Sequence, residues 1–277
     1  MTGFLPSKLG LLTRLTAHST NSNHITDIFP TEIGNLVQLS LFAVSTNNIT
    51  GSIQSELGRL INLTNLATNE NHLTSTIPTE LGNLAQLSCF QAYTNIFTGS
   101  LPSELGRLTK LSFLAIIESQ LTSSIPTELR NLTQLVSLIA YGNVLTGSLL
   151  SELRHLTQLL LLATGDNHLS STVPKEYGRL QQLLFFDVHA NALSGTLPTE
   201  LGILTGLAHL DLSVNNFNGT IPKELSLLSD LQYLNISVNQ LTGTIPSALG
   251  QLDDLCKCFF GLLPYRSKSG CSSCCDG

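Results

Sequence analysis

Residues 39–63 read LSLFAVSTNNITGSIQSELGRLINL, and this arrangement of apolar and polar positions recurs along the chain every 24 residues. A polar residue, with an apolar residue two positions later, marks each recurrence. These polar residues are Asn23, Asn47, Asn71, Asn95, Ser119, Asn143, Asn167, Asn191, Asn215 and Asn239. A fixed period of this kind is typical of a solenoid, whose coils bury their apolar sides against their neighbours. We therefore expect one continuous core and long, regular surfaces.

Each repeat predicts three short elements. Apolar residues at 42 and 44 alternate with exposed neighbours, which predicts a short strand. The stretch after the recurring Asn predicts a turn and then a second, shorter strand, and a single helical turn follows. Proline recurs at 30, 78, 102, 126, 174, 198, 222 and 246, where we expect it at the first helical position. A Glu two residues later complements the positive helix end.

The recurring Asn residues are expected to be structural. In the turns of a coil, inward-pointing main-chain N–H and C=O groups lack strand partners, and burying one of them unpaired costs about 1–3 kcal/mol. An Asn side chain offers both a donor and an acceptor, so stacked copies can bridge neighbouring coils. Ser119 can do only part of this, and the fifth repeat is therefore predicted to be a local weak point.

The consensus L-x-x-N-x-L-T-G-x-I-P-x-E-L-G-x-L-x-x-L resembles the plant-specific class of leucine-rich repeat, known from ectodomains of receptor-like kinases, receptor-like proteins and polygalacturonase inhibitors. The resemblance covers residues 1–255. It implies an α/β repeat solenoid, a right-handed superhelix of about ten 24-residue repeats, with a parallel β-sheet on the concave face and short 3-10 or helical turns on the convex side. Residues 256–277 are expected to form a Cys-rich C-terminal cap or an unstructured tail.

Composition excludes several kinds of partner. The net charge is −6, so we expect no nucleic-acid partner. No apolar run approaches the roughly 20 residues of a membrane-spanning helix, so no membrane insertion by this chain is expected. The N-terminus, MTGFLPSKLG, begins in mid-repeat and lacks the pattern of a secretory signal. The sequence therefore favours a fragment of a longer protein, and the resemblance implies an extracellular or cell-surface location.

The concave face carries the predicted ligand-binding residues. Positions flanking the buried strand residues change along the chain from small or amide side chains, through large apolar ones, to polar ones. The candidates are Tyr93, Phe113, Ile117, Ile139, Tyr141, Leu161, Phe185, Asp187, His189, His209 and Asp211. Large apolar groups on a rigid face are typical anchors of protein interfaces. We expect non-catalytic recognition of a protein, peptide or carbohydrate, by a soluble binder or by the ectodomain of a membrane receptor kinase.

Neither catalysis nor metal binding is predicted. Asp187 and Asp211 are expected one strand apart, with His189 and His209 on diagonals of about 7–8 Å. Zinc requires ligands that converge at about 2.0–2.2 Å, so this spacing does not favour a metal site. The chain shows no nucleophile with its base and no phosphate-binding Gly loop, and we expect neither an enzyme nor a cofactor.

A second surface offers an alternative function. Thr or Ser recurs in pairs such as Thr50 and Ser52, Thr74 and Thr76, and Thr242 and Thr244, on the predicted second strand. Their side chains are expected to point outward as a Thr-x-Thr ladder, with a spacing of about 4.8 Å between coils. Because ice-binding solenoids carry similar ladders, binding to ice or another crystal surface is an alternative hypothesis.

Cysteines gather at the C-terminal end. Cys256, Cys258, Cys271, Cys274 and Cys275 are candidates for a disulfide-bonded cap, and the resemblance implies such caps in secreted relatives. Their spacing also leaves open a metal site or an unstructured tail. Cys89 stands apart on a predicted strand and is expected to be a free thiol.

Overall fold

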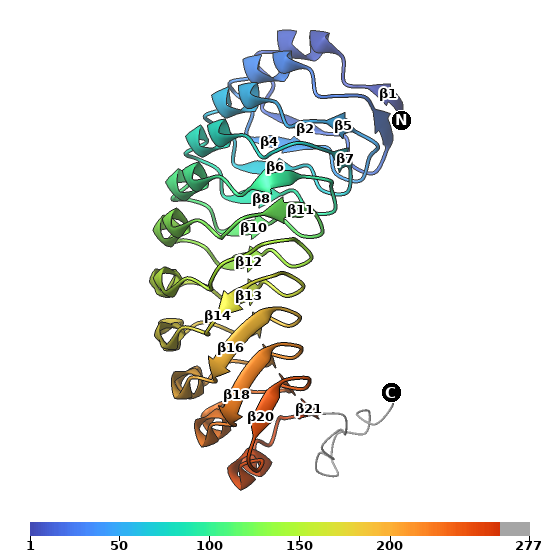
Figure 1. The fold of residues 1–277 in the computed structure, drawn as a ribbon. Helices are drawn as coiled ribbons and strands as arrows, with labels where there is room; N and C mark the ends of the chain where they lie inside the picture. Colours follow the sequence, from blue (N-terminus) through green and yellow to red (C-terminus); the bar gives the residue numbers. More distant parts are fainter. Residues whose placement is uncertain (261–277) are drawn as a thin grey trace. The chain divides into compact units, whose positions relative to one another are not determined.

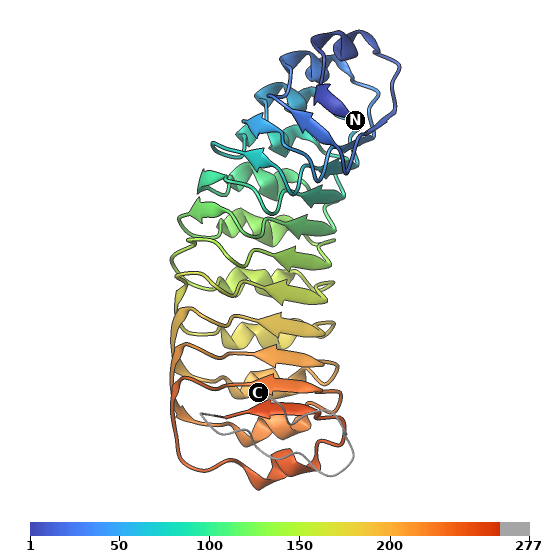
Figure 2. The ribbon, with the colours of Figure 1, turned by 90° about the vertical axis from the view of Figure 1, so that its right-hand side faces the viewer.

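The computed structural model describes residues 1–260 and shows two compact units of stacked coils (Figure 1 and Figure 2). The N-unit is Met1–Leu145, and the C-unit is Thr146–Gly277, described up to residue 260. In each unit every coil contributes one strand to a main parallel sheet on one side and one 3-10 helix on the other side. The solenoid predicted from the 24-residue period is confirmed.

The main sheet of the N-unit is parallel and regular. Its strands are β2 (Ala17–Ser19), β4 (Leu41–Ala43), β6 (Asn65–Ala67), β8 (Cys89–Gln91), β10 (Phe113–Ala115) and β12 (Ser137–Ile139). Each residue pairs with the residue 24 positions later, as Leu41 does with Asn65. Equivalent residues therefore stand in straight rows across the sheet.

Shorter strands and 3-10 helices complete the coils of the N-unit. The strands are β1 (Thr2–Phe4), β3 (His24–Thr26), β5 (Thr50–Gly51), β7 (His72–Leu73), β9 (Thr98–Ser100) and β11 (Gln120–Thr122). The 3-10 helices are η1 (Ser7–Leu11), η2 (Thr31–Asn35), η3 (Ser55–Arg59), η4 (Thr79–Asn83), η5 (Ser103–Arg107) and η6 (Thr127–Asn131).

The C-unit repeats this plan. Its main sheet contains β13 (Leu161–Ala163), β15 (Phe185–Asp187), β17 (His209–Asp211), β19 (Tyr233–Asn235) and β21 (Lys257–Phe259). A second sheet has the order β14 (Ser170–Ser171), β16 (Ala192–Thr196), β18 (Asn216–Thr220) and β20 (Gln240–Thr242). The 3-10 helices are η7 (Ser151–His155), η8 (Lys175–Arg179), η9 (Thr199–Ile203), η10 (Lys223–Leu227) and η11 (Ser247–Gln251).

Leucine fills the space between sheet and 3-10 helices. The invariant Leu column, represented by Leu63 and Leu207, is fully buried, as is the strand column represented by Leu66 and Leu210. Burying such a side chain stabilises the fold by about 1.5–3 kcal/mol. The core therefore extends through each unit as a row of equivalent apolar layers.

The recurring Asn side chains join adjacent coils. Asn47 Oδ1 accepts a hydrogen bond from the Ile25 N–H at 2.9 Å, and its Nδ2 donates to the Thr20 carbonyl, also at 2.9 Å. Asn215 makes the equivalent bonds in the C-unit. From Nδ2, the following residues also donate to main-chain carbonyls two and three positions before them: Asn23, Asn71, Asn95, Asn143, Asn167, Asn191 and Asn239.

Ser119 interrupts this ladder. Its Oγ is buried without a hydrogen-bond partner in residues 1–260. The N–H of Phe97 also has no hydrogen-bond acceptor within residues 1–260. An Asn at position 119 would accept a hydrogen bond from this N–H, as Asn95 and Asn143 do from the equivalent groups. One turn of the N-unit therefore lacks the cross-link that the other turns have.

Proline lies one position earlier than expected. The extended N-cap residue of η2 is Pro30, with φ −69° and ψ 137°, and the helix begins at Thr31. The expectation that proline occupies the first helical position is therefore wrong. The reason is that ψ stays in the extended region at proline, and the 3-10 turn follows it. Within η2, a Cβ on Gly34 would lie 2.6 Å from the Glu56 carbonyl oxygen, so only glycine allows these helices to stack this closely.

The main sheet continues beyond residue 255. Strand β21 pairs with β19, and Cys258 occupies the buried position that Leu234 holds one coil earlier. Burial raises the pKa of the Cys258 thiol to about 12, so this thiol is protonated at neutral pH. Cys256 is half-buried beside it, while Cys271, Cys274 and Cys275 lie outside the described residues.

Candidate functional site

The open face of the N-unit sheet presents scattered apolar side chains. Phe113 lies in β10 and Ile139 in β12, and both are half-buried. Tyr93, Ile117 and Tyr141 follow β8, β10 and β12, in one row beyond the strand ends. The structure thus places these five predicted residues on one face of the N-unit, in three rows: Phe113 in the first, Ile139 in the second, and Tyr93, Ile117 and Tyr141 in the third.

The open face of the C-unit sheet carries a stack of rings. Phe185 and His209 stack with ring centroids 4.0 Å apart and planes inclined by 7°. His209 and Tyr233 stack at 4.2 Å and 3°. The predicted residue Leu161 pairs with Phe185 and begins the same row. We call Phe185, His209 and Tyr233 the ring stack.

The ring stack presents edges rather than faces. Each face of His209 is covered by a neighbouring ring, and Phe259 lies at 5.9 Å from Tyr233 with its plane tilted by 51°. Burial lowers the pKa of His209 although the carboxylates of Asp187 and Asp211 oppose this effect, so the imidazole is neutral at pH 7. The stack is therefore an uncharged, rigid ridge.

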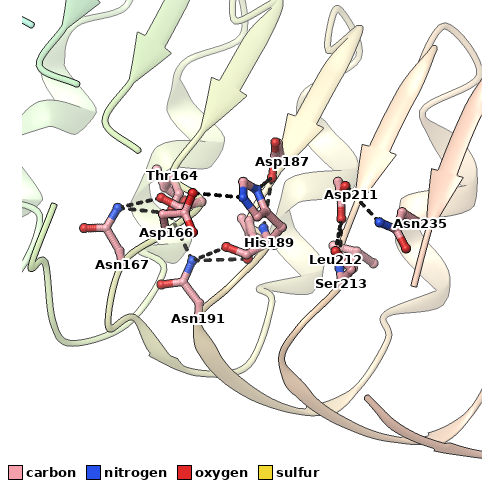
Figure 3. A network of polar contacts seen from close by, with 12 residues as sticks. Thr164, Asp166, Asn167, Asp187, His189, Asn191, Asp211, Leu212, Ser213 and Asn235 are labelled. Atoms are coloured by element: carbon pink, nitrogen blue, oxygen red, sulfur yellow. Dashed lines mark hydrogen bonds and ion pairs between the residues drawn. The ribbon is translucent and has the colours of Figure 1, made fainter. Parts of the chain in front are cut away.

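A repeated local motif follows the strands that carry the ring stack, and Figure 3 shows it at Asp187 with His189 and at Asp211 with Ser213. Asp187 Oδ1 accepts hydrogen bonds from the N–H and from Nδ1 of His189, two residues later. Asp211 and Asn235 do the same with the N–H and hydroxyl groups of Ser213 and Ser237. Three adjacent coils thus fix their side chains with the same turn, in the manner of an Asx-turn.

Asp211 is buried and fully hydrogen-bonded. Besides the two bonds from Ser213 to Oδ1, its Oδ2 accepts from the Tyr233 hydroxyl at 3.1 Å and from Asn235 Nδ2 at 3.2 Å. Its side chain therefore holds Tyr233 in the ring stack, and neither oxygen is left open to a ligand.

His189 joins two carboxylates. Its Nδ1 lies 2.7 Å from Asp187 Oδ1, and its Nε2 lies 3.1 Å from Asp166 Oδ2. The hydrogen bond with Asp187, together with the charges of Asp187, Asp166 and Asp211, raises the pKa of His189 to about 9 against the opposing effect of burial. The imidazole is therefore a cation at pH 7.

The position of the His189 ring depends on a glycine in the preceding coil. The ring folds back onto Asp187 of its own coil because Gly165 leaves room for it: a Cβ on Gly165 would clash with His189 Nδ1. Even so, no group of three or more His, Cys, Asp or Glu side chains within residues 1–260 is arranged to hold a metal ion.

Sequence reasoning missed several members of this surface, namely Asp166, Gly165, Tyr233 and Phe259 as site residues. One signal was available. The tripeptides at 187, 211 and 235 read Asp-Val-His, Asp-Leu-Ser and Asn-Ile-Ser, a carboxylate or amide followed two residues later by a hydrogen-bond donor.

The second sheet of the C-unit does not align equivalent residues directly. Thr196 pairs with Asn218, and Thr220 pairs with Thr242, an offset of 22 residues instead of 24. The Thr242 hydroxyl donates to the Gly219 carbonyl at 3.2 Å. A Cβ on Gly219 would lie 2.9 Å from the Thr196 methyl, so this methyl packs against the next coil. The pairing therefore shifts equivalent Thr residues by two positions between coils, while Thr196, Thr220 and Thr242 remain exposed as expected.

Comparison with known proteins agrees with this architecture. Residues 206–228 and 230–252 match the family model described as Leucine Rich Repeat. The plant peptide hormone receptor RGFR1, solved in complex with RGF2, is 30% identical with a TM-score of 0.91, over 92% of this chain and 41% of that chain. The Arabidopsis receptor kinase HAESA, solved with the peptide hormone IDA and the co-receptor SERK1, is 32% identical with a TM-score of 0.86, over 90% and 42%.

A plant ice-binding protein is also similar, with 26% identity and a TM-score of 0.72, over 88% of this chain and 78% of that chain. No curated protein matches by sequence. The chain spans less than half of the length of the receptor chains RGFR1 and HAESA. Across residues 1–260, no helix has the length and apolar character needed to cross a membrane.

Proposed function

Since this chain is a leucine-rich-repeat protein, we propose that the open face of its main sheet binds an extended peptide or protein segment without catalysis. Two relatives with the same fold, RGFR1 and HAESA, were solved in complex with peptide partners. An open face also offers an extended chain a long contact surface, whereas small molecules favour enclosed sites.

The observation that carries the proposal is the ring stack of the C-unit. Phe185, His209 and Tyr233 are held by one another, and Tyr233 is also held by Asp211. Ordering a rotamer-rich side chain on binding costs about 0.5–1.5 kcal/mol, and side chains that are already ordered avoid this cost. A rigid ridge of aromatic edges is therefore a suitable anchor for a partner.

The alternative ligand class, carbohydrate, has less support. Sugars commonly lie flat on an exposed aromatic face, and in the ring stack both faces of His209 are covered. Beside the ring stack, Asp211 has no oxygen left for a sugar hydroxyl, because both of its oxygens already accept hydrogen bonds. We place peptide recognition first.

The N-unit face is proposed as a separate contact area. Tyr93, Phe113, Ile117, Ile139 and Tyr141 supply apolar surface there, but no described aromatic stacking holds them. Replacing Phe113 and Tyr141 by Ala tests this area independently of the C-unit.

The experiment for the C-unit is selection of linear peptides from a random display library, followed by affinity measurement. The double variant Phe185→Ala, Tyr233→Ala should weaken the selected peptides about 30-fold or more, as expected for loss of an interface anchor of about 2 kcal/mol. The matched control removes two exposed apolar side chains from the opposite side of the C-unit, Ile203 in η9 and Leu227 in η10. Equal binding by both double variants would refute the proposal.

Ice binding is the second candidate because a similar plant protein binds ice. In the C-unit Thr196 and Thr242 are exposed, but the offset pairing displaces equivalent Thr residues by two positions between coils, which weakens the match to a regular ice surface. Thermal hysteresis of the purified chain decides this directly. Measurable hysteresis that is lost on Thr196→Lys would favour ice binding over peptide recognition.

Membership of a larger receptor is also a proposal. The similar receptors are longer than this chain, and a location outside the cell follows only by analogy with them. Sequencing the complete transcript tests whether a membrane segment and a kinase belong to the same protein.

A further inference from the structure

Charge is unevenly distributed between the two sides of the C-unit. On the side of the 3-10 helices of the described part, the basic residues Arg154, Lys175, Arg179 and Lys223 are matched in number by Glu152, Glu176, Glu200 and Glu224. On the main sheet, Lys257 in β21 is the only Lys or Arg up to residue 260. The carboxylates of Asp166, Asp187 and Asp211 lie instead at or just beyond the ends of β13, β15 and β17.

The positive charge of His189 does not balance the negative charges of these carboxylates. His189 contacts Asp187 through one ring nitrogen and Asp166 through the other, so one positive charge serves two carboxylates. Asp211 adds a third negative charge nearby. His209 adds no positive charge because it is neutral at pH 7. The face around β13–β17 therefore keeps a net negative charge.

Two carboxylates retain open acceptor positions. Asp187 Oδ1 receives both bonds from His189, and no hydrogen bond to its Oδ2 is found within residues 1–260. Asp166 contacts His189 through Oδ2 and its side chain is 56% exposed. Asp211, in contrast, receives four hydrogen bonds. A positively charged ligand group would thus meet Asp166 first and then the free Oδ2 of Asp187, whose side chain is 17% exposed.

We propose that this face selects a peptide segment with a basic side chain, Lys or Arg, placed against Asp166 and Asp187, while the ring stack contacts the aliphatic stem and the neighbouring residues. This inference rests on the proposed function and specifies its partner. A basic side chain matches the face because its apolar stem can lie along apolar surface while its charged head meets the carboxylates. Lys257 lies at the opposite end of the face, where its positive charge disfavours a basic side chain of the ligand.

The test starts with peptides selected from the random display library on the wild-type chain. Lys and Arg should be enriched in those peptides that lose affinity for the Phe185→Ala, Tyr233→Ala variant. A selected peptide is then synthesised with its basic residue intact or replaced by Gln. The Gln peptide should bind the wild type about tenfold more weakly, the scale of a hydrogen bond to a charged group.

The complementary change is made in the protein. Asp166→Asn together with Asp187→Asn should weaken the basic peptide about tenfold and leave the Gln peptide unaffected, which is the signature of direct coupling. Glu200→Gln in η9 removes one carboxylate from the opposite side of the C-unit and should change neither affinity. If the double variant fails to fold, Asp166→Asn alone serves, because this side chain is exposed.

The outcomes separate the two proposals. Selected peptides that depend on the ring stack but show no enrichment in Lys or Arg, or no coupling to Asp166 and Asp187, overturn the basic-segment proposal and leave peptide recognition intact. Peptides that bind independently of the ring stack overturn both.

Discussion

Replacing Ser119 by Asn should stabilise the N-unit. By analogy with Asn95 and Asn143, the new side chain would accept from the Phe97 N–H and donate to the Ala92 carbonyl. Two hydrogen bonds contribute about 1 kcal/mol each, and satisfying a buried N–H removes a desolvation cost of about 1–3 kcal/mol. Ordering the Asn side chain offsets roughly 1 kcal/mol. The expected net gain is about 2–4 kcal/mol.

Solenoids can unfold locally, so the assay should report on this turn as well as on the whole unit. Native-state hydrogen exchange at the Phe97 amide should slow by about tenfold or more in Ser119→Asn, and the urea midpoint should rise. The reverse change, Asn71→Ser, should lower stability by about 2–3 kcal/mol because it removes the partner of the buried Ile49 N–H. An unchanged exchange rate at Phe97 would show that the missing cross-link is not the cause of the weak turn.

Three further changes follow from single contacts. Tyr177→Phe should raise stability by about 1–3 kcal/mol, because the Tyr177 hydroxyl is buried without a partner among residues 1–260; urea unfolding at an unchanged m-value is the check. Ser171→Gly should add about 0.5–1 kcal/mol, because Ser171 adopts φ +74°, a region that favours glycine; a fall in the thermal midpoint would contradict this. His189 has a pKa of about 9 in the folded chain and about 6.5 unfolded, so its contribution is complete below pH 6.5 and is lost as the pH rises through 9. The wild type should therefore lose stability relative to His189→Gln across this window.

The period of the sequence was enough to predict the main sheet. The invariant Leu column, including Leu63, can be buried on every coil only if the coils stack in register, and the observed pairing of Leu41 with Asn65 shows that register. The row to which Phe185 and His209 belong follows from the same spacing. Backbone periodicity therefore predicts which residues share a face.

Periodicity could not predict contacts that depend on departures from the repeat. His189 reaches Asp166 only because Gly165 stands where Tyr141 stands one coil earlier, and the ring occupies the space that a side chain would fill. The offset of the second sheet depends on the path of the backbone after each Asn, and many different sequences can follow that path. Such features depend on steric contacts of individual residues, and a consensus sequence does not describe these contacts.

The C-unit separates the residues that maintain the fold from those available to a partner, with one exception. Asn191 and Asn215 satisfy main-chain groups inside the coils and leave the strand positions free to vary. Phe185 does not contact this ladder, so its loss should weaken binding and cost the fold only its stacking contact with His209. Asp211 contributes to both the fold and the binding surface, because its buried carboxylate holds Ser213 in the turn and Tyr233 in the ring stack. Binding and stability should therefore change together at Asp211, whereas at Phe185 binding should change more than stability.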